Sequence, residues 1–394
     1  MRSGRGNRCR AASRVDAVVV GGGPAGCLAA ACLQATGRRV VLLNRLRTAQ
    51  PAGAGAHVHR IPSASWQGLE ALLPGFRQAV VEAGAVEGRL ACQSSVDCDD
   101  AEPTPWLSRP LLDRAMRRRV KSAGVLVKDS CALQVTAPGK REWEVDYQLA
   151  GGRSSVARLR ASLMIDASGS ARAALGGVAV ALGMPIPLLQ VPGRDTYCSM
   201  RMTGVSLPPD AGALSLGDAS TGRMIIQRLE SSPEDGATHL LTLIARAGNH
   251  RVRAVNRTDI DLHGLVREDV RCAAVLERAR PVTASLRFGP LPIQLLQMHR
   301  VAPAAPGWLA IGDALLVTSP AKGLGISWAV LQAERLRKGL SDGLQSDELR
   351  CSLGELAEAA WLRASFAEAL EDDGFHPDNS FDPERDQNQE SCHA

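Results

Sequence analysis

The chain has 394 residues, of which 45% are hydrophobic, and a formal net charge of +5. This length suits two or three domains with a substantial core, and no apolar run approaches the roughly 20 residues of a membrane-spanning helix. The basic residues are almost all arginine and are dispersed along the chain, while only 3% of the residues are aromatic. These features do not favour a nucleic-acid-binding protein, which would cluster its basic residues with aromatic residues among them.

The ten cysteines include no CxxC pair, which predicts reduced thiols and a cytoplasmic location. Residues 1–14 are basic and contain no acidic residue, but they lack both the apolar run of a secretory leader and an amphipathic pattern. We therefore expect residues 1–14 to form a disordered tail.

A glycine-rich turn lies between a predicted strand and a predicted helix near the N-terminus. Asp16–Val20 is a β-branched run, and Gly21–Gly26 follows it with the pattern G-x-G-x-x-G. Helical composition then continues to Gly37, and Arg39–Leu43 is a second predicted strand. In such a βαβ unit the glycines allow a tight turn, admit a pyrophosphate to the helix N-terminus and let helix and strand pack closely. The segment therefore predicts a dinucleotide site.

The end of the second predicted strand departs from the usual pattern. An acidic residue commonly binds the ribose hydroxyls there, whereas this chain has Asn44 followed by Arg45. An amide can still form a hydrogen bond with a hydroxyl, but without the assistance of a charge. We expect the affinity for the dinucleotide to be weakened or altered.

A second glycine cluster lies near the other end of the chain. Gly312 and Asp313, followed by Pro320, Gly323 and Gly325, precede an apolar pattern of helical period. Glycines at the start of a helix let its N–H groups approach a ligand, and the helix dipole favours negative charge there. An ordinary loop leading into a helix, with Asp313 as its cap, is the alternative interpretation of this segment taken alone.

With both clusters in this order, the chain resembles the FAD-dependent aromatic hydroxylases and their relatives, which include squalene-type epoxidases, geranylgeranyl reductases and flavin-dependent halogenases. The resemblance covers about half of the chain and rests on four segments: Gly21–Gly26, Arg109–Asp113 (R-x-x-L), Asp166–Gly169 (D-A-S-G) and Gly312–Gly325.

The resemblance implies an α/β fold, with a Rossmann-like FAD-binding domain of the GR2 type, an inserted and mainly antiparallel β-sheet substrate domain, and C-terminal helices. The strands of the inserted sheet are predicted at TYCSMRMTGV, RMIIQRLE and THLLTLIARAG, where we favour the solvent face for the arginines 201, 223 and 228. The expected boundaries are 15–85, 105–180 and 286–340 for the FAD-binding domain, 86–104 and 181–285 for the substrate domain, 341–371 for a helical segment and 372–394 for a disordered tail.

By resemblance, Asp313 would accept hydrogen bonds from the ribityl hydroxyls of FAD, and Gly323 and Gly325 would lie against the isoalloxazine ring. The full set of expected FAD-binding residues is Gly21, Gly23, Pro24, Ala25, Gly26, Asn44, Arg45, Arg109, Asp166, Gly169, Gly312, Asp313, Pro320, Gly323, Leu324, Gly325 and Ile326.

Beyond the flavin itself, no catalytic residue is assigned, but three side chains could contribute. His57 and His59 alternate as in an H-x-H element of a bacterial subset of this family, which suggests contact with flavin or substrate. A solvent-exposed pair and a metal site are the alternatives, although two histidines without a third ligand predict no metal site. Lys322 is either solvent-exposed or a charge that stabilises reduced flavin.

The resemblance implies a monooxygenase that inserts one oxygen atom of O₂ into an aromatic or olefinic substrate through a flavin C4a-hydroperoxide, with NAD(P)H or a flavin reductase as electron source. A peptide substrate, as in oxidation of a protein-bound tryptophan during quinone-cofactor maturation, is an alternative. A halogenase is another, although the K-x-G and W-x-W-x-I-P elements are missing. A reductase and a flavin-free Rossmann scaffold also remain open.

Overall fold

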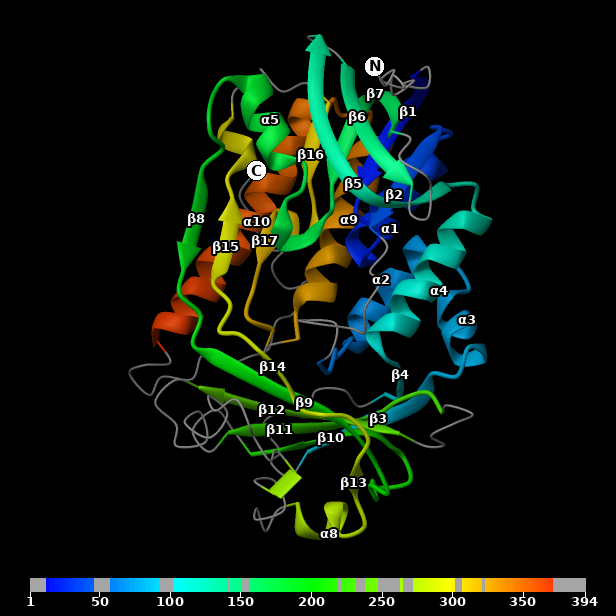
Figure 1. Ribbon diagram of the computed structural model, residues 1–394, viewed down its shortest axis with the longest axis vertical. Helices are drawn as coiled ribbons and strands as arrows, with labels where there is room; N and C mark the ends of the chain where they lie inside the picture. The colour runs from blue at the N-terminus through cyan, green and yellow to red at the C-terminus, as the bar shows by residue number, and fades with distance from the viewer. Residues whose placement is uncertain are drawn as a thin grey trace, which may run out of the picture.

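The protein consists of an upper body built around a mixed β-sheet and a lower sheet that covers one end of this body (Figure 1). The computed structural model describes residues 12–45, 57–92, 102–139, 142–149, 156–217, 222–231, 238–246, 263–264, 272–301, 307–320 and 323–370. Within these ranges no helix is long and apolar enough to cross a membrane.

The upper body contains a sheet of six strands in the part of the chain that the structure describes. Parallel pairing joins β16, β7, β1, β2 and β5 in that order, and β6 lies antiparallel between β5 and β7. The inner strands are continuous apolar runs because helices cover both faces of a parallel sheet. The bounds are Ser13–Val20 (β1), Val40–Arg45 (β2), Leu126–Gly139 (β5), Glu142–Leu149 (β6), Val156–Asp166 (β7) and Trp308–Ala310 (β16).

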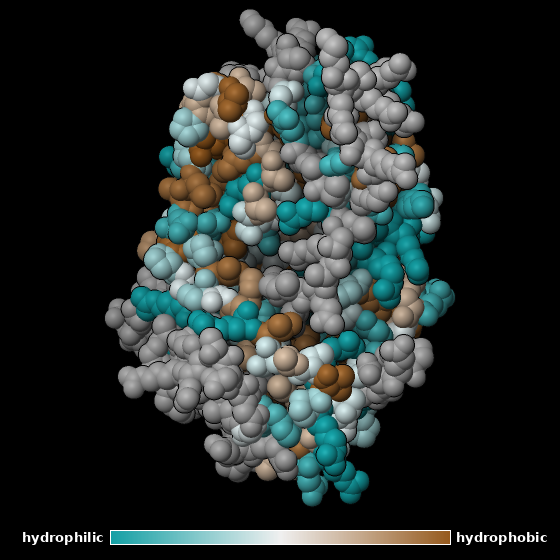
Figure 2. All heavy atoms as spheres, viewed as in Figure 1, coloured by the Kyte–Doolittle hydropathy of each residue, from teal (hydrophilic) through white to brown (hydrophobic). Residues whose placement is uncertain are grey.

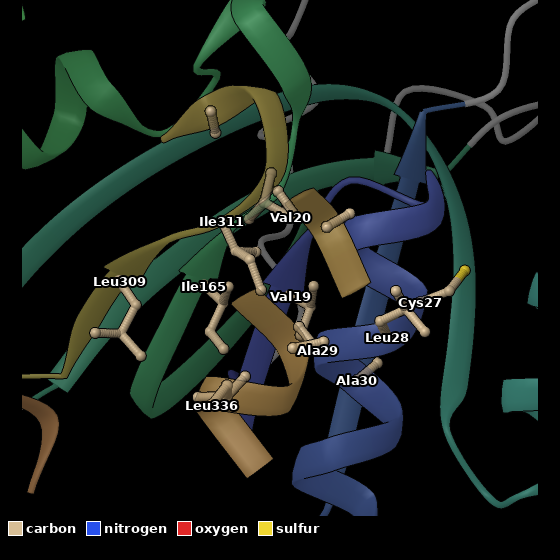
Figure 3. Close-up of a cluster of buried hydrophobic side chains, with 14 of the residues drawn as sticks. Val19, Val20, Cys27, Leu28, Ala29, Ala30, Ile165, Leu309, Ile311 and Leu336 are labelled. Atoms are coloured by element: carbon tan, nitrogen blue, oxygen red, sulfur yellow. The ribbon is translucent and has the colours of Figure 1, made fainter. Parts of the chain in front are cut away.

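Two helices distant in sequence, α1 and α9, pack side by side on the sheet. Figure 3 shows the cluster that joins them, with Val19 and Ile165 from the strands, Leu28 from α1 and Leu336 from α9. This packing brings the two glycine-rich segments to the same end of the sheet, since each precedes one of these helices. The helices are α1 (Pro24–Ala35), α2 (Ser63–Leu72), α3 (Phe76–Glu82), α4 (Arg109–Ser122), α5 (Leu175–Leu182), α9 (Gly325–Ser341) and α10 (Ser346–Leu370).

The lower sheet is called the roof sheet here because it covers one end of the upper body (Figure 1). Its strands run in the order β13-β9-β12-β11-β10-β3-β4, and β14 also pairs with β9. Its strands alternate between two faces, as the period of a strand requires. Met224 and Leu241 point into a core shared with α8 (Ala273–Leu276), and their neighbours Ile225 and Thr242 face the upper body. The bounds are Val86–Cys92 (β3), Thr104–Trp106 (β4), Asp195–Thr203 (β9), Ala211–Leu216 (β10), Arg223–Arg228 (β11), His239–Arg246 (β12), Arg280–Pro281 (β13) and Leu286–Phe288 (β14).

A small sheet of β17 (Leu316–Val317), β15 (Ile293–Leu296) and β8 (Leu188–Val191) forms one flank of the upper body. Figure 2 shows apolar side chains gathered on this flank, where Val180 of α5 and Leu188 of β8 are exposed. Neither side chain lines the cavity described below.

The predicted fold class is confirmed, with a Rossmann-like sheet, a second sheet inserted into it and helices toward the C-terminus. The three strands predicted for the inserted sheet are β9, β11 and β12. β10 was missed because its sequence, AGALSL, consists largely of residues with little strand preference.

The strands cross the predicted segment boundaries at three points. β1 begins at Ser13, inside the segment expected to be a tail, and residues 1–11 and 371–394 lie outside the described residues. β8 pairs with β15 rather than with the roof sheet, and β14 pairs with β9.

Replacement of Gly26 tests the close packing at the start of α1. A Cβ on Gly26 would overlap the carbonyl oxygen of Gly21, so Gly26→Ala should lower the free energy of unfolding by about 1–3 kcal/mol. Urea denaturation followed by circular dichroism measures the change. Gly176→Ala, in the first turn of α5 with open space around it, serves as the control and should be neutral or slightly stabilising. Equal stability of Gly26→Ala and the wild type would contradict this packing.

Candidate functional site

A cavity of about 930 Å³ lies between the carboxyl end of the six-stranded sheet and the roof sheet. Its walls include Val20 at the end of β1, Asn44 in β2 and Ala167 just after β7. Open α/β sheets bind ligands at this end of their strands. The volume is near the upper limit of typical small-molecule sites.

The two glycine-rich turns meet at this cavity. Gly312 has a φ of +65°, and a Cβ on it would lie 2.5 Å from the Cβ of Ala25 in the other turn. The Gly312 N–H donates to Oε1 of Gln332 on α9 at 2.5 Å. The second turn is therefore held between α1 and α9, and it has no room for a side chain at Gly312.

The first turn also packs against the segment that follows β7. Gly21 has a φ of +116°, and a Cβ on it would overlap the carbonyl oxygen of Ala167. Two backbone hydrogen bonds hold this segment, from Ala167 N to Val20 O at 2.8 Å and from Ile311 N to Asp166 O at 2.9 Å. The end of β1, the residues after β7 and Ile311 after β16 thus meet at the first glycine turn.

The structure places most of the predicted site residues together. The cavity is lined by Gly21, Gly23, Pro24, Ala25, Asn44, Arg45, His57, His59, Arg109, Gly169, Gly312, Asp313, Pro320, Gly323, Gly325 and Ile326. Gly26, Asp166 and Leu324 do not line it, and Lys322 lies outside the described residues.

Asp166 is a buried residue whose carboxylate is already occupied. One oxygen accepts from the backbone N and the hydroxyl of Ser168 at 3.0 and 2.6 Å, and the other accepts from Ala174 N at 3.1 Å. Burial raises the pKa of Asp166, and these hydrogen bonds oppose the shift. In this structure Asp166 therefore shapes the turn after β7.

Asp313 faces the cavity and has no hydrogen-bond partner among the described residues. Its side chain is exposed within the cavity, and the protein atoms packed around the carboxylate raise its pKa by desolvation. The positive charges of Arg109 and Arg172 oppose the shift. An unpaired carboxylate in such a position is suited to accept hydrogen bonds from hydroxyl groups of a ligand.

Arg172 supports the turn that carries Asp313, and the sequence interpretation missed it. Its side chain is buried, and its backbone lies in the left-handed region with a φ of +45°. Its Nε donates to Ala314 O at 3.0 Å, and Nη1 donates to Oε1 of Gln294 at 2.9 Å. Arg172 thereby ties the segment after β7 to the turn that carries Asp313. Nothing in the sequence DASGSAR distinguishes it from an exposed arginine.

The arginines of α4 make the wall beside the first glycine turn positively charged. Arg109 pairs with Asp113 at 2.8 Å, and its Nη2 lies 3.6 Å from the position of a Cβ on Gly23. Arg117 donates from Nη1 to Gly22 O at 3.0 Å, and Arg114 also lines the cavity. This charge and the N-terminus of α1 suit an anionic group at the turn.

The roof sheet contributes two rows of side chains to the other half of the cavity. Phe288, Tyr197, Ile244 and Arg223 are neighbours across four strands, and all four line the cavity. The second row comprises Ser199, Thr242 and Ile225, of which Thr242 and Ile225 line the cavity. Arg223 therefore does not have the purely solvent-facing position that its sequence context favoured. This half of the cavity is mainly apolar and aromatic.

His57 is buried beside these rows, at the end of a chain of two hydroxyl groups. Its Nδ1 lies 2.5 Å from Ser199 Oγ, which lies 2.6 Å from Thr242 Oγ1, and Thr242 accepts from Val58 N at 3.3 Å. The ring also contacts Phe288, with centroids 5.1 Å apart. Burial lowers the pKa of His57 to about 4, so the imidazole is neutral at pH 7.

The hydroxyl chain determines the tautomer of His57. Both hydroxyl protons have acceptors only if Thr242 donates to Ser199 and Ser199 donates to Nδ1 of His57, since Thr242 already accepts from Val58. This order leaves only the Nε2–H of His57 without a partner among the described residues, whereas the opposite order leaves both Nε2 and the Thr242 hydroxyl without one. The proton of neutral His57 is therefore on Nε2, which has no partner within the described ranges.

Comparison with known proteins identifies the family. The family model described as FAD dependent oxidoreductase matches residues 16–278, more than half of the chain. The chain therefore belongs to the FAD-dependent oxidoreductases, and its cofactor is FAD. A search of curated proteins gave no match.

Solved structures show the same fold at low sequence identity. The flavin-dependent brominase Bmp2 is 16% identical over 91% of this chain and 90% of the brominase, with a TM-score of 0.66. The p-nitrophenol 4-monooxygenase PnpA from Pseudomonas putida DLL-E4 is 16% identical over 95% of this chain and 92% of PnpA, with a TM-score of 0.64. The peptidyl tryptophan dihydroxylase QhpG is 18% identical over 90% of this chain and 74% of QhpG, with a TM-score of 0.58.

The charge of Asp313 should reduce the stability of the flavin-free protein. Because folding raises its pKa, this carboxylate disfavours the folded state at pH 7, and the effect disappears as the pH falls through the raised pKa. Flavin-stripped Asp313→Asn should therefore unfold at a higher temperature than the wild type at pH 7, and the difference should shrink toward about pH 4. Asp210→Asn, at an exposed position, is the control. A lower melting temperature for Asp313→Asn at pH 7 would refute the argument.

The tautomer of His57 can be observed by nuclear magnetic resonance. We expect ¹⁵N shifts of an unprotonated Nδ1 and a protonated Nε2 at pH 7, and an imidazole that titrates at a pH of about 4. Ser199→Ala, which removes the donor to Nδ1, should release this preference. A proton on Nδ1 in the wild type would show that the hydroxyl chain runs in the other direction.

Proposed function

We propose that this FAD-dependent oxidoreductase is a monooxygenase that inserts one oxygen atom of O₂ into an aromatic or olefinic substrate. One observation carries the proposal: a single cavity extends from the glycine turns of the sheet to the aromatic and branched apolar side chains of the roof sheet. When bound, FAD supplies the activation of O₂, and the protein supplies orientation and exclusion of water.

The cavity residues on the sheet side suit, one after another, the pyrophosphate, the ribityl chain and the isoalloxazine ring of FAD. Backbone N–H groups at the start of α1 would bind the pyrophosphate, with Arg109 adding positive charge. The unpaired carboxylate of Asp313 would accept hydrogen bonds from the ribityl hydroxyls. Gly323 and Gly325 line the cavity at the start of α9, so this helix N-terminus would lie near the isoalloxazine ring and favour negative charge on it.

The cavity residues on the roof side suit an apolar, unsaturated substrate. Tyr197, Phe288, Ile225 and Ile244 offer flat and branched apolar surfaces and would align a ring or an alkene beside the cofactor. The neutral His57 would donate from Nε2 to an oxygen atom of the substrate. Because its pKa is about 4, it would keep this role throughout the neutral pH range.

The electron source would be NAD(P)H bound transiently or a separate flavin reductase. The sequence contains one G-x-G-x-x-G segment, at Gly21–Gly26, and the proposed position of FAD uses it. A second nucleotide site of the Rossmann type would need another such turn.

An isotope experiment tests the reaction. Protein reconstituted with FAD is supplied with NAD(P)H or a flavin reductase under ¹⁸O₂ and screened against phenols, indoles, styrenes and tryptophan-containing peptides. We expect one ¹⁸O atom in the product, measured by mass spectrometry. A halogenated product in the presence of bromide, or oxidation with oxygen drawn only from water, would contradict the proposal.

A variant of the roof sheet connects this reaction to the cavity. Ile225→Trp should fill part of the substrate half, because Ile225 lines the cavity and is only half-buried. Product formation should fall at least about tenfold while NAD(P)H oxidation continues and releases hydrogen peroxide. The affinity for FAD should change less than about threefold, since Ile225 lies on the roof side. Parallel loss of FAD binding and product formation would contradict the division of the cavity into two halves.

A further inference from the structure

The amide of Asn44 has a fixed orientation at the end of β2. Its Nδ2 donates to Oδ1 of Asp129 on the adjacent strand β5 at 2.6 Å. The ambiguity that usually affects amide side chains does not arise here, because a carboxylate only accepts hydrogen bonds and must face the NH₂ group. The carbonyl oxygen Oδ1 of Asn44 is therefore directed away from Asp129.

The carbonyl oxygen of this amide lies toward the first glycine turn. A Cβ placed on Gly22 would clash with Oδ1 of Asn44 and would lie 2.8 Å from its Cγ. Asn44 lines the cavity and is only 9% exposed. Its Oδ1 accepts no hydrogen bond from the described residues. An acceptor that is held in place at the wall of a cavity and has no donor among the described residues is available to a donor on a ligand.

The sheet holds the two residues in register. Asn44 and Asp129 are direct neighbours in the parallel pairing of β2 with β5. The hydroxyl of Ser130 donates to the backbone carbonyl of Asn44 at 3.4 Å. Asp129 itself is exposed and does not line the cavity. It can therefore influence a ligand only through Asn44.

We propose that Asp129 is a positioning residue for the adenosine half of FAD: it holds the Asn44 amide so that Oδ1 accepts a hydrogen bond from a ribose hydroxyl. In Rossmann-type sites a carboxylate at this position binds the ribose directly. Here the two roles are divided, with a neutral acceptor on β2 and the carboxylate that orients and polarises it on β5. The proposal rests on the proposed position of FAD but not on the reaction that the enzyme catalyses.

Binding of ADP and its deoxy analogues to flavin-stripped protein tests the proposal directly. The Kd values are measured by competition with FAD, and the change in flavin fluorescence reports how much FAD is bound. The wild type should bind ADP about tenfold more tightly than 2′-deoxy-ADP or 3′-deoxy-ADP, whichever lacks the bound hydroxyl. In Asp129→Ala the amide can rotate, so this ratio should fall toward one and FAD should bind about tenfold more weakly.

Exchange of the two side chains gives a second and independent test. Asn44→Asp alone would place two carboxylates within hydrogen-bonding distance and should weaken FAD binding more than Asp129→Ala does. Combining it with Asp129→Asn restores a donor–acceptor pair and should return the Kd of FAD to within about threefold of the wild type. Lys128→Ala, next to Asp129 on β5 and exposed, is the control and should leave every Kd unchanged.

Three outcomes would overturn the proposal. Asp129→Ala with an unchanged ratio of ADP to deoxy-ADP affinity would show that the pair is structural only. A double variant no better than Asn44→Asp would show that the pair does not act as a unit. Failure of ADP to compete with FAD in the wild type would instead remove the proposed position of FAD. A ratio of affinities is insensitive to partial unfolding, so a loss of stability in any variant cannot mimic the expected result.

Discussion

The whole arrangement depends on the close approach of backbone segments at the first glycine turn. Gly21 leaves no room for a side chain beside Ala167, and Gly26 leaves none beside the carbonyl of Gly21. Gly312 brings the second turn against Ala25 in the same way. These contacts have a shared consequence: the ends of β1 and β7, the start of α1 and the turn before α9 surround one space. Larger residues would separate the segments and open the cavity.

The cavity holds a carboxylate that is unfavourable without a ligand. Asp313 faces the cavity, has a raised pKa and has no hydrogen-bond partner in the described ranges. Such a carboxylate disfavours the empty protein and becomes satisfied when a ligand provides hydroxyl groups. The roof side differs, because aromatic and branched apolar side chains lie there beside a neutral imidazole. One cavity can thus hold a polar cofactor and an apolar substrate.

The sequence could predict the features of this site that depend on local pattern. The strand, glycine turn and helix at Asp16–Gly37 follow from residue type and spacing, as do the strands β9, β11 and β12 of the roof sheet. Gly312 and Asp313 were recognised because glycines and a lone carboxylate precede an apolar helical pattern. The family resemblance then gave the order in which these segments meet.

The remaining features could not be predicted because they are pairs of residues distant in the chain. Asp129 acquires its meaning only from the register of β5 against β2, and Gln332 only from the packing of α9 on α1. The link from His57 to Ser199 joins a loop to a strand more than 140 residues later, and although the H-x-H element marks His57, no local signal marks Ser199 as its partner.

The central claim is that the two glycine turns form one binding site for FAD. A crystal structure of the protein with FAD tests it most directly. The account predicts that the pyrophosphate lies at the start of α1, that Asp313 contacts the ribityl chain, and that the isoalloxazine ring lies between the start of α9 and the roof sheet. FAD bound elsewhere, or bound at Gly21–Gly26 with its ring directed away from Asp313, would contradict the account.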